Sequence, residues 1–179
     1  MWKSKTLLIL SLVWRSESQM KRKNMYLCKV EIKMWMMENV FELLEKPYWV
    51  VDILPKQVPK DSAGQYFKVE QYFLKRRPAL CEKFVSVLLK LNCYLDMEVS
   101  EDGESWTLNP YPEALEQAIS AYMNGGPTNA MFYVFLRLEK TLIVIDWDST
   151  SMTLYNPSET LLDLVRQLVM PEGLYLWKP

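Results

Sequence analysis

The fold of this chain is decided by three neighbouring stretches: AMFYVFLRL (residues 130–138), TLIVIDWD (141–148) and SMTLYN (151–156). Each stretch is rich in aromatic and β-branched residues, and a short polar connection separates it from the next. Residues of these types pack well on a pleated sheet, and short connections join antiparallel strands. The three stretches therefore predict consecutive antiparallel strands.

The C-terminal end of the sequence predicts a helix and one further strand. Ser158 can cap a helix over residues 159–169, because a serine oxygen accepts a hydrogen bond from a backbone N–H of the first turn. Pro171 and Gly173 end this helix, and LYLWK (174–178) follows as an edge strand.

Upstream of the three stretches, apolar spacing and turn residues predict the remaining elements. They are a short helix over 38–46, a strand over 48–54, helices over 65–75 and 78–91, a hairpin of 93–100 with 104–109, and a helix from Pro112 to Asn124. An aromatic-rich strand is the alternative for 65–75, although its apolar spacing favours a helix. Hairpin connections imply an α+β fold, a mainly antiparallel sheet with helices packed on one face.

Charge divides the sequence near residue 37. Residues 1–37 carry eight basic and two acidic residues, a net charge of +6, whereas residues 38–179 carry 13 basic and 20 acidic residues, a net charge of −7. Six of the eleven methionines also lie in 1–37. We interpret 1–37 as a basic leader from an over-extended gene start and 38–179 as a single α+β domain. The apolar run at 6–14 leaves a secretory signal peptide open, and a genuine appended element is the third interpretation.

Composition excludes several classes of protein. The acidic charge of 38–179 argues against binding to nucleic acids or anionic membranes, where Lys and Arg neutralise phosphate, and it suits a basic protein partner. The chain contains no histidine, which excludes Ser-His-Asp and Cys-His catalysis and histidine-ligated zinc. It has only five glycines, which excludes a glycine-rich phosphate loop, and it carries no nucleotide or haem signature.

The three cysteines, Cys28, Cys81 and Cys93, form no CxxC pair. We expect Cys81 and Cys93, which stand among apolar residues, to be small core side chains with free thiols. This usage is typical of a reducing compartment, so the expected location is the cytoplasm.

The candidate catalytic residues are carboxylates near the ends of predicted strands. Asp146 and Asp148 are two positions apart and would point to one face of a strand, where paired carboxylates can bind Mg²⁺ or Mn²⁺. Asp52 stands inside an apolar run, so it lies either on a solvated strand face or beside a partner, and Glu70 could face a pocket among aromatic residues. The catalytic candidates are thus Asp52, Glu70, Asp146 and Asp148, and the metal candidates are Asp146 and Asp148. The simpler interpretation is that the strand-end carboxylates lie on solvated faces: Asp52, Asp96, Glu98, Asp146 and Asp148.

Two further groups of residues could bind a ligand. Exposed aromatic rings can stack bases or sugars, but we expect most of these rings to pack in the core. They are Tyr48, Trp49, Tyr66, Phe67, Tyr72, Phe73, Trp106 and Trp147. Lys75-Arg76-Arg77 is the basic cluster of the domain, and we interpret it as a solvated connector before a helix, with phosphate or an acidic partner as its alternative ligand.

Three segments carry a family resemblance: YWVVDILPKQVPKDSAGQYFKVEQYFL (48–74), LNCYLDMEV (91–99) and GLYLWKP (173–179). The chain resembles a small family of uncharacterised bacterial proteins that share the Y-W-V-x-D-I-L-P-x-x-V-P segment. The resemblance extends over essentially 38–179 and implies no activity.

Two functions follow as hypotheses from different classes. The first is a noncatalytic binding or interaction module with an acidic surface, such as an inhibitor of a basic protein. The alternative is a metal-dependent hydrolase or nuclease that uses the strand-end carboxylates. A small-ligand pocket lined by aromatic residues stands between them.

Overall fold

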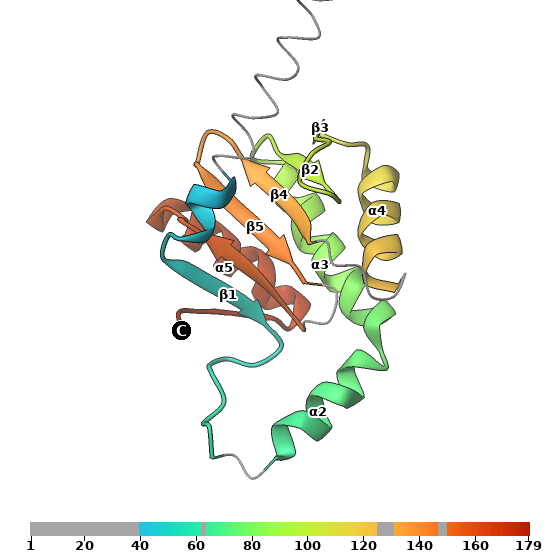
Figure 1. Ribbon diagram of the computed structural model, residues 1–179, viewed down its shortest axis with the longest axis vertical. Helices are drawn as coiled ribbons and strands as arrows, with labels where there is room; N and C mark the ends of the chain where they lie inside the picture. Colours follow the sequence, from blue (N-terminus) through green and yellow to red (C-terminus); the bar gives the residue numbers. More distant parts are fainter. Residues whose placement is uncertain (1–39, 62–63, 125–130, 147–149) are drawn as a thin grey trace, which may run out of the picture. The chain divides into compact units, whose positions relative to one another are not determined.

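A twisted antiparallel sheet organises the residues that the computed structural model describes, which are 40–61, 64–124, 131–146 and 150–179 (Figure 1). Within these residues the sheet has seven strands in the order β3-β2-β4-β5-β6-β1-β7, and every paired neighbour is antiparallel. The strands are β1 Tyr48–Asp52, β2 Glu98–Ser100, β3 Thr107–Leu108, β4 Phe132–Leu136, β5 Thr141–Ile145, β6 Ser151–Tyr155 and β7 Tyr175–Trp177. The predicted meander (β4, β5, β6) and the edge strand β7 are confirmed.

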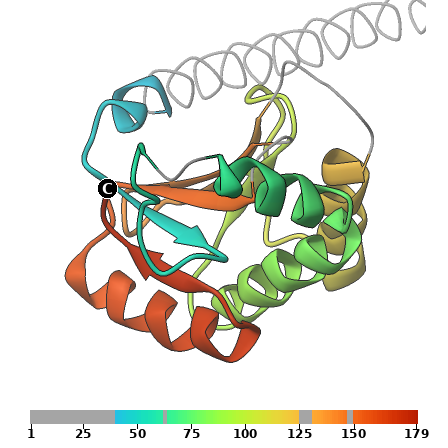
Figure 2. The same ribbon diagram turned by 90° about the horizontal axis from the view of Figure 1, so that it is seen from below.

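Three helices cover one face of this sheet, as the sequence predicts (Figure 2). They are α3 Arg77–Asn92, α4 Pro112–Asn124 and α5 Glu159–Val169, and a 3₁₀ turn, Met170–Glu172, follows α5. The predicted cap of α5 is present, because the Ser158 side chain accepts a hydrogen bond from the backbone N–H of Leu161 at 3.2 Å. The main core lies between this face of the sheet and the three helices. The described fold is therefore α+β.

Two helical segments lie away from that layer. Residues 40–44 form a short helical turn on the other face of the sheet (Figures 1 and 2). Helix α2, Gln65–Leu74, follows the loop after β1 and projects beyond the sheet (Figure 1). The structure thus confirms a helix over 65–75 and excludes the alternative of a strand there.

Strand alternation places Asp52 on the face away from α3, α4 and α5. Val51 belongs to the main core, so its neighbours in β1, Val50 and Asp52, point to the other face. Across the sheet Asp52 pairs with Ser151 of β6 on one side and with Tyr175 of β7 on the other. The last residue of β1 is therefore held between two strands from the C-terminal part of the chain.

The predicted hairpin of 93–100 with 104–109 forms, but its strands are shorter than predicted. The N–H groups of Cys93 and Tyr94 donate to the carbonyl groups of Lys90 and Leu91, so the chain still follows the end of α3 and pairing begins only at β2. On the other side of the turn, Asp102 accepts hydrogen bonds from the next backbone N–H groups and delays β3 until Thr107.

Several predictions fall on residues outside the described ranges. They concern the basic leader 1–37, the glycine pair after α4, Trp147 and Asp148. The boundary between leader and domain therefore stays a prediction. Among the described residues, no helix is both long enough and apolar enough to cross a membrane.

Candidate functional site between strand β1 and helix α2

Asp52 ends β1 at the entrance to an irregular loop that contains Pro55 and Pro59. Its Oδ1 atom accepts a hydrogen bond from the backbone N–H of Leu54 at 3.1 Å, which fixes the carboxylate at the strand end. The side chain is half-buried. We expected Asp52 either on a solvated strand face or buried beside a partner, and the structure shows an intermediate case, a half-buried carboxylate that accepts hydrogen bonds from backbone N–H groups.

One side of helix α2, here called its inward side, is partly buried, and the opposite, outward side is exposed. Tyr66, Glu70, Phe73 and Leu74 are partly buried, and their spacing of three and four residues places them on one side of the helix. On this side the Tyr66 hydroxyl donates a hydrogen bond to Glu70 Oε1 at 2.9 Å. Glu70 therefore lies on the inward side, beside a tyrosine that reaches toward β1.

A pocket of about 340 Å³ lies between the end of β1, the following loop, α2 and β7. That volume is near the lower end of the range for small-molecule sites, roughly 300–1,000 Å³. The pocket is lined by Asp52, Leu54, Lys56, Gln57, Val58, Pro59, Lys60, Tyr66, Phe67 and Trp177. It therefore combines one carboxylate and two lysines with three aromatic rings.

Asp52 is the one carboxylate among the described residues that line this pocket, and the charge of Glu70, which does not line it, acts on Asp52 and Tyr66. Burial raises the pKa of Asp52, the Glu70 charge acts in the same direction, and hydrogen bonds from the N–H groups of Leu54 and Ile53 oppose the shift. The pKa of Tyr66 is raised to about 12 by burial, by its hydrogen bond to Glu70 and by the charges of Glu70 and Asp52. No lysine or arginine in the described part of the chain forms an ion pair with Asp52 or Glu70.

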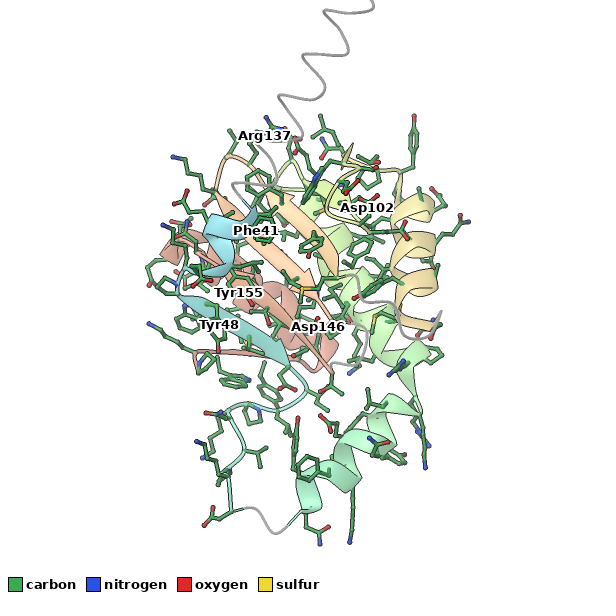
Figure 3. The ribbon with its side chains drawn as sticks, viewed as in Figure 1. Phe41, Tyr48, Asp102, Arg137, Asp146 and Tyr155 are labelled. Carbon is green, nitrogen blue, oxygen red and sulfur yellow. The ribbon has the colours of Figure 1, made fainter. Side chains whose placement is uncertain are left out.

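Of the four catalytic candidates, Asp52 lines the pocket, Glu70 lies outside the lining but near enough for its charge to raise the pKa of Asp52, and Asp146 lies apart. Asp146 follows β5 on the same face as Tyr48 and Tyr155, whose ring centroids are 5.5 Å apart (Figure 3). Strand β6 separates β5 from β1. Burial, and then the Asp146 charge, raise the pKa values of Tyr133 and Tyr155, neither of which lines the pocket of Asp52.

One member of the predicted metal pair, Asp148, lies outside the described residues. Within the described ranges, no group of three or more His, Cys, Asp or Glu side chains is arranged to hold a metal ion. Magnesium or manganese at Asp146 and Asp148 therefore stays a prediction.

Three expectations from the sequence are wrong. Glu98 does not lie on a solvated face: it is buried, and one of its carboxylate oxygens pairs with Arg137. Cys93 is exposed and not in the core, because it caps the C-terminal end of α3, whereas Cys81 is buried as expected. Both described thiols are free.

The third wrong expectation concerns the aromatic residues, which we expected mostly in the core. None of the seven described members of that set is fully buried. On α2 the exposed fraction is 66% for Phe67 and 51% for Tyr72. Their positions, one residue away from Tyr66 and Phe73, carry the signal that was missed, because adjacent residues of a helix point about 100° apart and cannot share one buried side.

The basic cluster Lys75-Arg76-Arg77 joins α2 to α3, which agrees with its interpretation as a connector. Arg76 also lies over the Tyr72 ring, with its guanidinium carbon 4.6 Å from the ring centroid. This contact orients Tyr72 on the outward side of α2.

No family model matches the chain, and no curated protein and no solved structure matches it either.

Proposed function

We propose that this chain is a noncatalytic interaction module that binds a protein partner through α2. One observation carries the proposal: α2 has no buried residue, although it contains five large aromatic or aliphatic side chains among its ten residues, and a sixth in Val69. Helices of a folded domain normally bury an apolar stripe. In the same domain α5 buries Leu161, Leu162, Val165 and Val169.

Helix α2 exposes three of its apolar side chains to solvent. Phe67, Val69 and Tyr72 are all exposed, and they lie within six residues. Val69 and Tyr72 are three residues apart and share one side of the helix. Exposed apolar side chains of this kind are typical of a contact site for another protein, because covering them removes ring and methyl groups from water. Aromatic residues also contribute most of the binding energy at protein interfaces.

The charge of the domain supports a basic partner. Residues 38–179 carry a net charge of −7, and long-range attraction of opposite charges speeds encounter with a basic protein. The free thiols Cys81 and Cys93 support a cytoplasmic location for this encounter, because a reducing compartment keeps thiols unpaired.

The test is a pull-down from a lysate of the source organism. It compares the proteins that bind to the immobilised full chain with the proteins that bind to each immobilised variant. Phe67→Ser and Tyr72→Ser should each lose the retained protein, whereas Tyr111→Ser should keep it. Tyr111 is the matched control because it is also exposed but precedes α4. Retention of the same protein by all three variants would refute a contact with α2.

A metal-dependent hydrolase or nuclease is the second candidate, supported by the proximity of Asp52 and Glu70. Two carboxylates can share a divalent cation or divide acid and base roles. Mg²⁺ or Mn²⁺ should then raise the melting temperature, by an amount that corresponds to about 2.7 kcal/mol at a concentration of 100 Kd. Loss of this stabilisation in Asp52→Asn or Asp146→Asn would favour the enzyme, and an unchanged melting temperature of the wild type would count against it.

A further inference from the structure

The pocket beside Asp52 has charges of opposite sign at different depths. Asp52 is half-buried, and Glu70 acts on it and on Tyr66 from the inward side of α2. Lys56 and Lys60 also line the pocket, but both are exposed, so their charges lie toward solvent. A ligand that enters this pocket therefore meets two lysines near the surface and a carboxylate farther in.

The carboxylate of Asp52 is able to bind a cation. Asp52 is partly removed from water and forms no ion pair within the described residues, and the Glu70 charge nearby makes its ionised form still more costly. A protonated amine would satisfy this carboxylate through a charge-assisted hydrogen bond. The rings of Tyr66, Phe67 and Trp177 line the same pocket and offer π-faces that also attract an ammonium group.

The two exposed lysines are able to bind an anion. Lys56 and Lys60 are four residues apart in one loop, and each has an ammonium group that can pair with a carboxylate. A purely cationic ligand would be repelled by them, and a purely anionic ligand would be repelled by Asp52 and Glu70. The charges of the pocket therefore select a zwitterion.

The volume of the pocket and its apolar lining narrow the class of ligand further. A volume of about 340 Å³ suits a small molecule of amino-acid size. Val58, Pro59 and Phe67 supply apolar contact, which favours a large apolar side chain on the ligand.

We propose that this pocket binds an α-amino acid with a large apolar side chain, with its ammonium group at Asp52 and its carboxylate at Lys56 and Lys60. The free N-terminal residue of a peptide offers the same ammonium group next to a carbonyl oxygen, and binding of a dipeptide distinguishes the two sources. This small-ligand site is separate from the protein contact proposed for α2, although Phe67 borders both.

The test is a titration of the full chain, labelled with ¹⁵N, with L-phenylalanine as the probe. The amide of Leu54, which donates to Asp52, and the indole N–H of Trp177 report on the pocket. We expect saturable shifts of both signals with a Kd of about 0.1–1 mM, a typical affinity for a ligand held by a few contacts. Absence of shifts at 20 mM probe, roughly twenty times the upper end of that range, would overturn the proposal.

Three analogues examine the charges one at a time on the unaltered protein. N-acetyl-L-phenylalanine lacks the ammonium group and should bind at least tenfold more weakly, and phenylethylamine lacks the carboxylate and should also bind more weakly. The dipeptide L-phenylalanyl-glycine separates the sources: tighter binding than L-phenylalanine would assign the pocket to a peptide N-terminus. Equal binding of the N-acetyl compound would refute recognition of an amine.

Two sets of variants test which residues bind the ammonium group and which bind the carboxylate of the ligand. Asp52→Asn should weaken binding of L-phenylalanine at least tenfold, and the matched control Asp163→Asn, on the exposed side of α5, should leave it unchanged. The double variant Lys56→Gln with Lys60→Gln should weaken binding of L-phenylalanine but not of phenylethylamine. Both lysines are exposed, so this variant remains informative even where Asp52→Asn alters the fold.

Discussion

Phe67→Ser should leave the fold nearly as stable as before. The side chain is 66% exposed, so only about one third of its surface is covered by the rest of the domain. Complete burial of a Phe side chain stabilises a fold by about 1.5–3 kcal/mol, and one third of that corresponds to about 0.5–1 kcal/mol. Ser and Phe have similar helix propensities, so the substitution adds little cost within α2.

Urea denaturation, followed by far-ultraviolet circular dichroism, measures this difference. The urea dependence of the unfolding free energy is about 1–3 kcal/mol per molar for small domains, so Phe67→Ser should lower the midpoint by less than about 1 M. Phe84→Ala is the contrasting variant, because Phe84 is completely buried at the centre of α3. It should cost about 3–5 kcal/mol.

A large effect of Phe67→Ser would refute the reasoning. A loss above about 2 kcal/mol would mean that the ring contributes to the fold as a buried residue does, since that is the scale of full burial. The exposed surface of α2 would then be a requirement of folding, and the proposed contact with a protein partner would lose its main support. A small effect together with loss of the retained partner would separate binding from stability.

Three further predictions concern stability. Asp52→Asn should stabilise the unliganded chain at pH 7. Burial raises the pKa of Asp52 in the folded state above its value in the unfolded state. The stability linked to this group is therefore present below the unfolded pKa and is lost as the pH rises through the folded pKa. Urea midpoints at pH 7 and pH 3 should show the difference only at the higher pH, and a variant less stable at pH 7 would contradict it. Ser158→Ala should cost about 1 kcal/mol in the same assay, because the N–H of Leu161 loses its cap, and no change would show that the cap is redundant. Gly103→Ala should cost about 1–2 kcal/mol, because φ is +72°, a left-handed conformation that residues with a Cβ atom disfavour; a neutral result would show that the turn relaxes.

Local chemistry made much of the sheet predictable from sequence. The strands β4, β5 and β6 follow each other with short connections, so composition and turn positions were sufficient. Ser158 likewise predicts the start of α5, because it stands directly before an apolar stripe. These features depend only on residues that are close in the sequence.

The candidate site depended on contacts that local patterns do not contain. Asp52 was recognisable as an acid inside an apolar run, but its face of the sheet depends on pairing with β6 and β7, about a hundred residues later. The charge of Glu70 acts on Asp52 only because α2 lies near the end of β1 in the fold. Apolar spacing also could not decide which side of α2 is exposed, because apolar residues occur on more than one side of it.

The register of β1 explains why the Asp52 side chain can line the pocket. Val51 occupies the core, and a shift of one residue would place Asp52 among buried apolar side chains. The register is fixed from both sides, by β6 and by β7, so the carboxylate keeps its half-buried position at the pocket. Phe67 lines that pocket and is also part of the exposed surface of α2. A ligand in the pocket and a protein on α2 would therefore contact the same ring, and each would change the affinity for the other by the same factor.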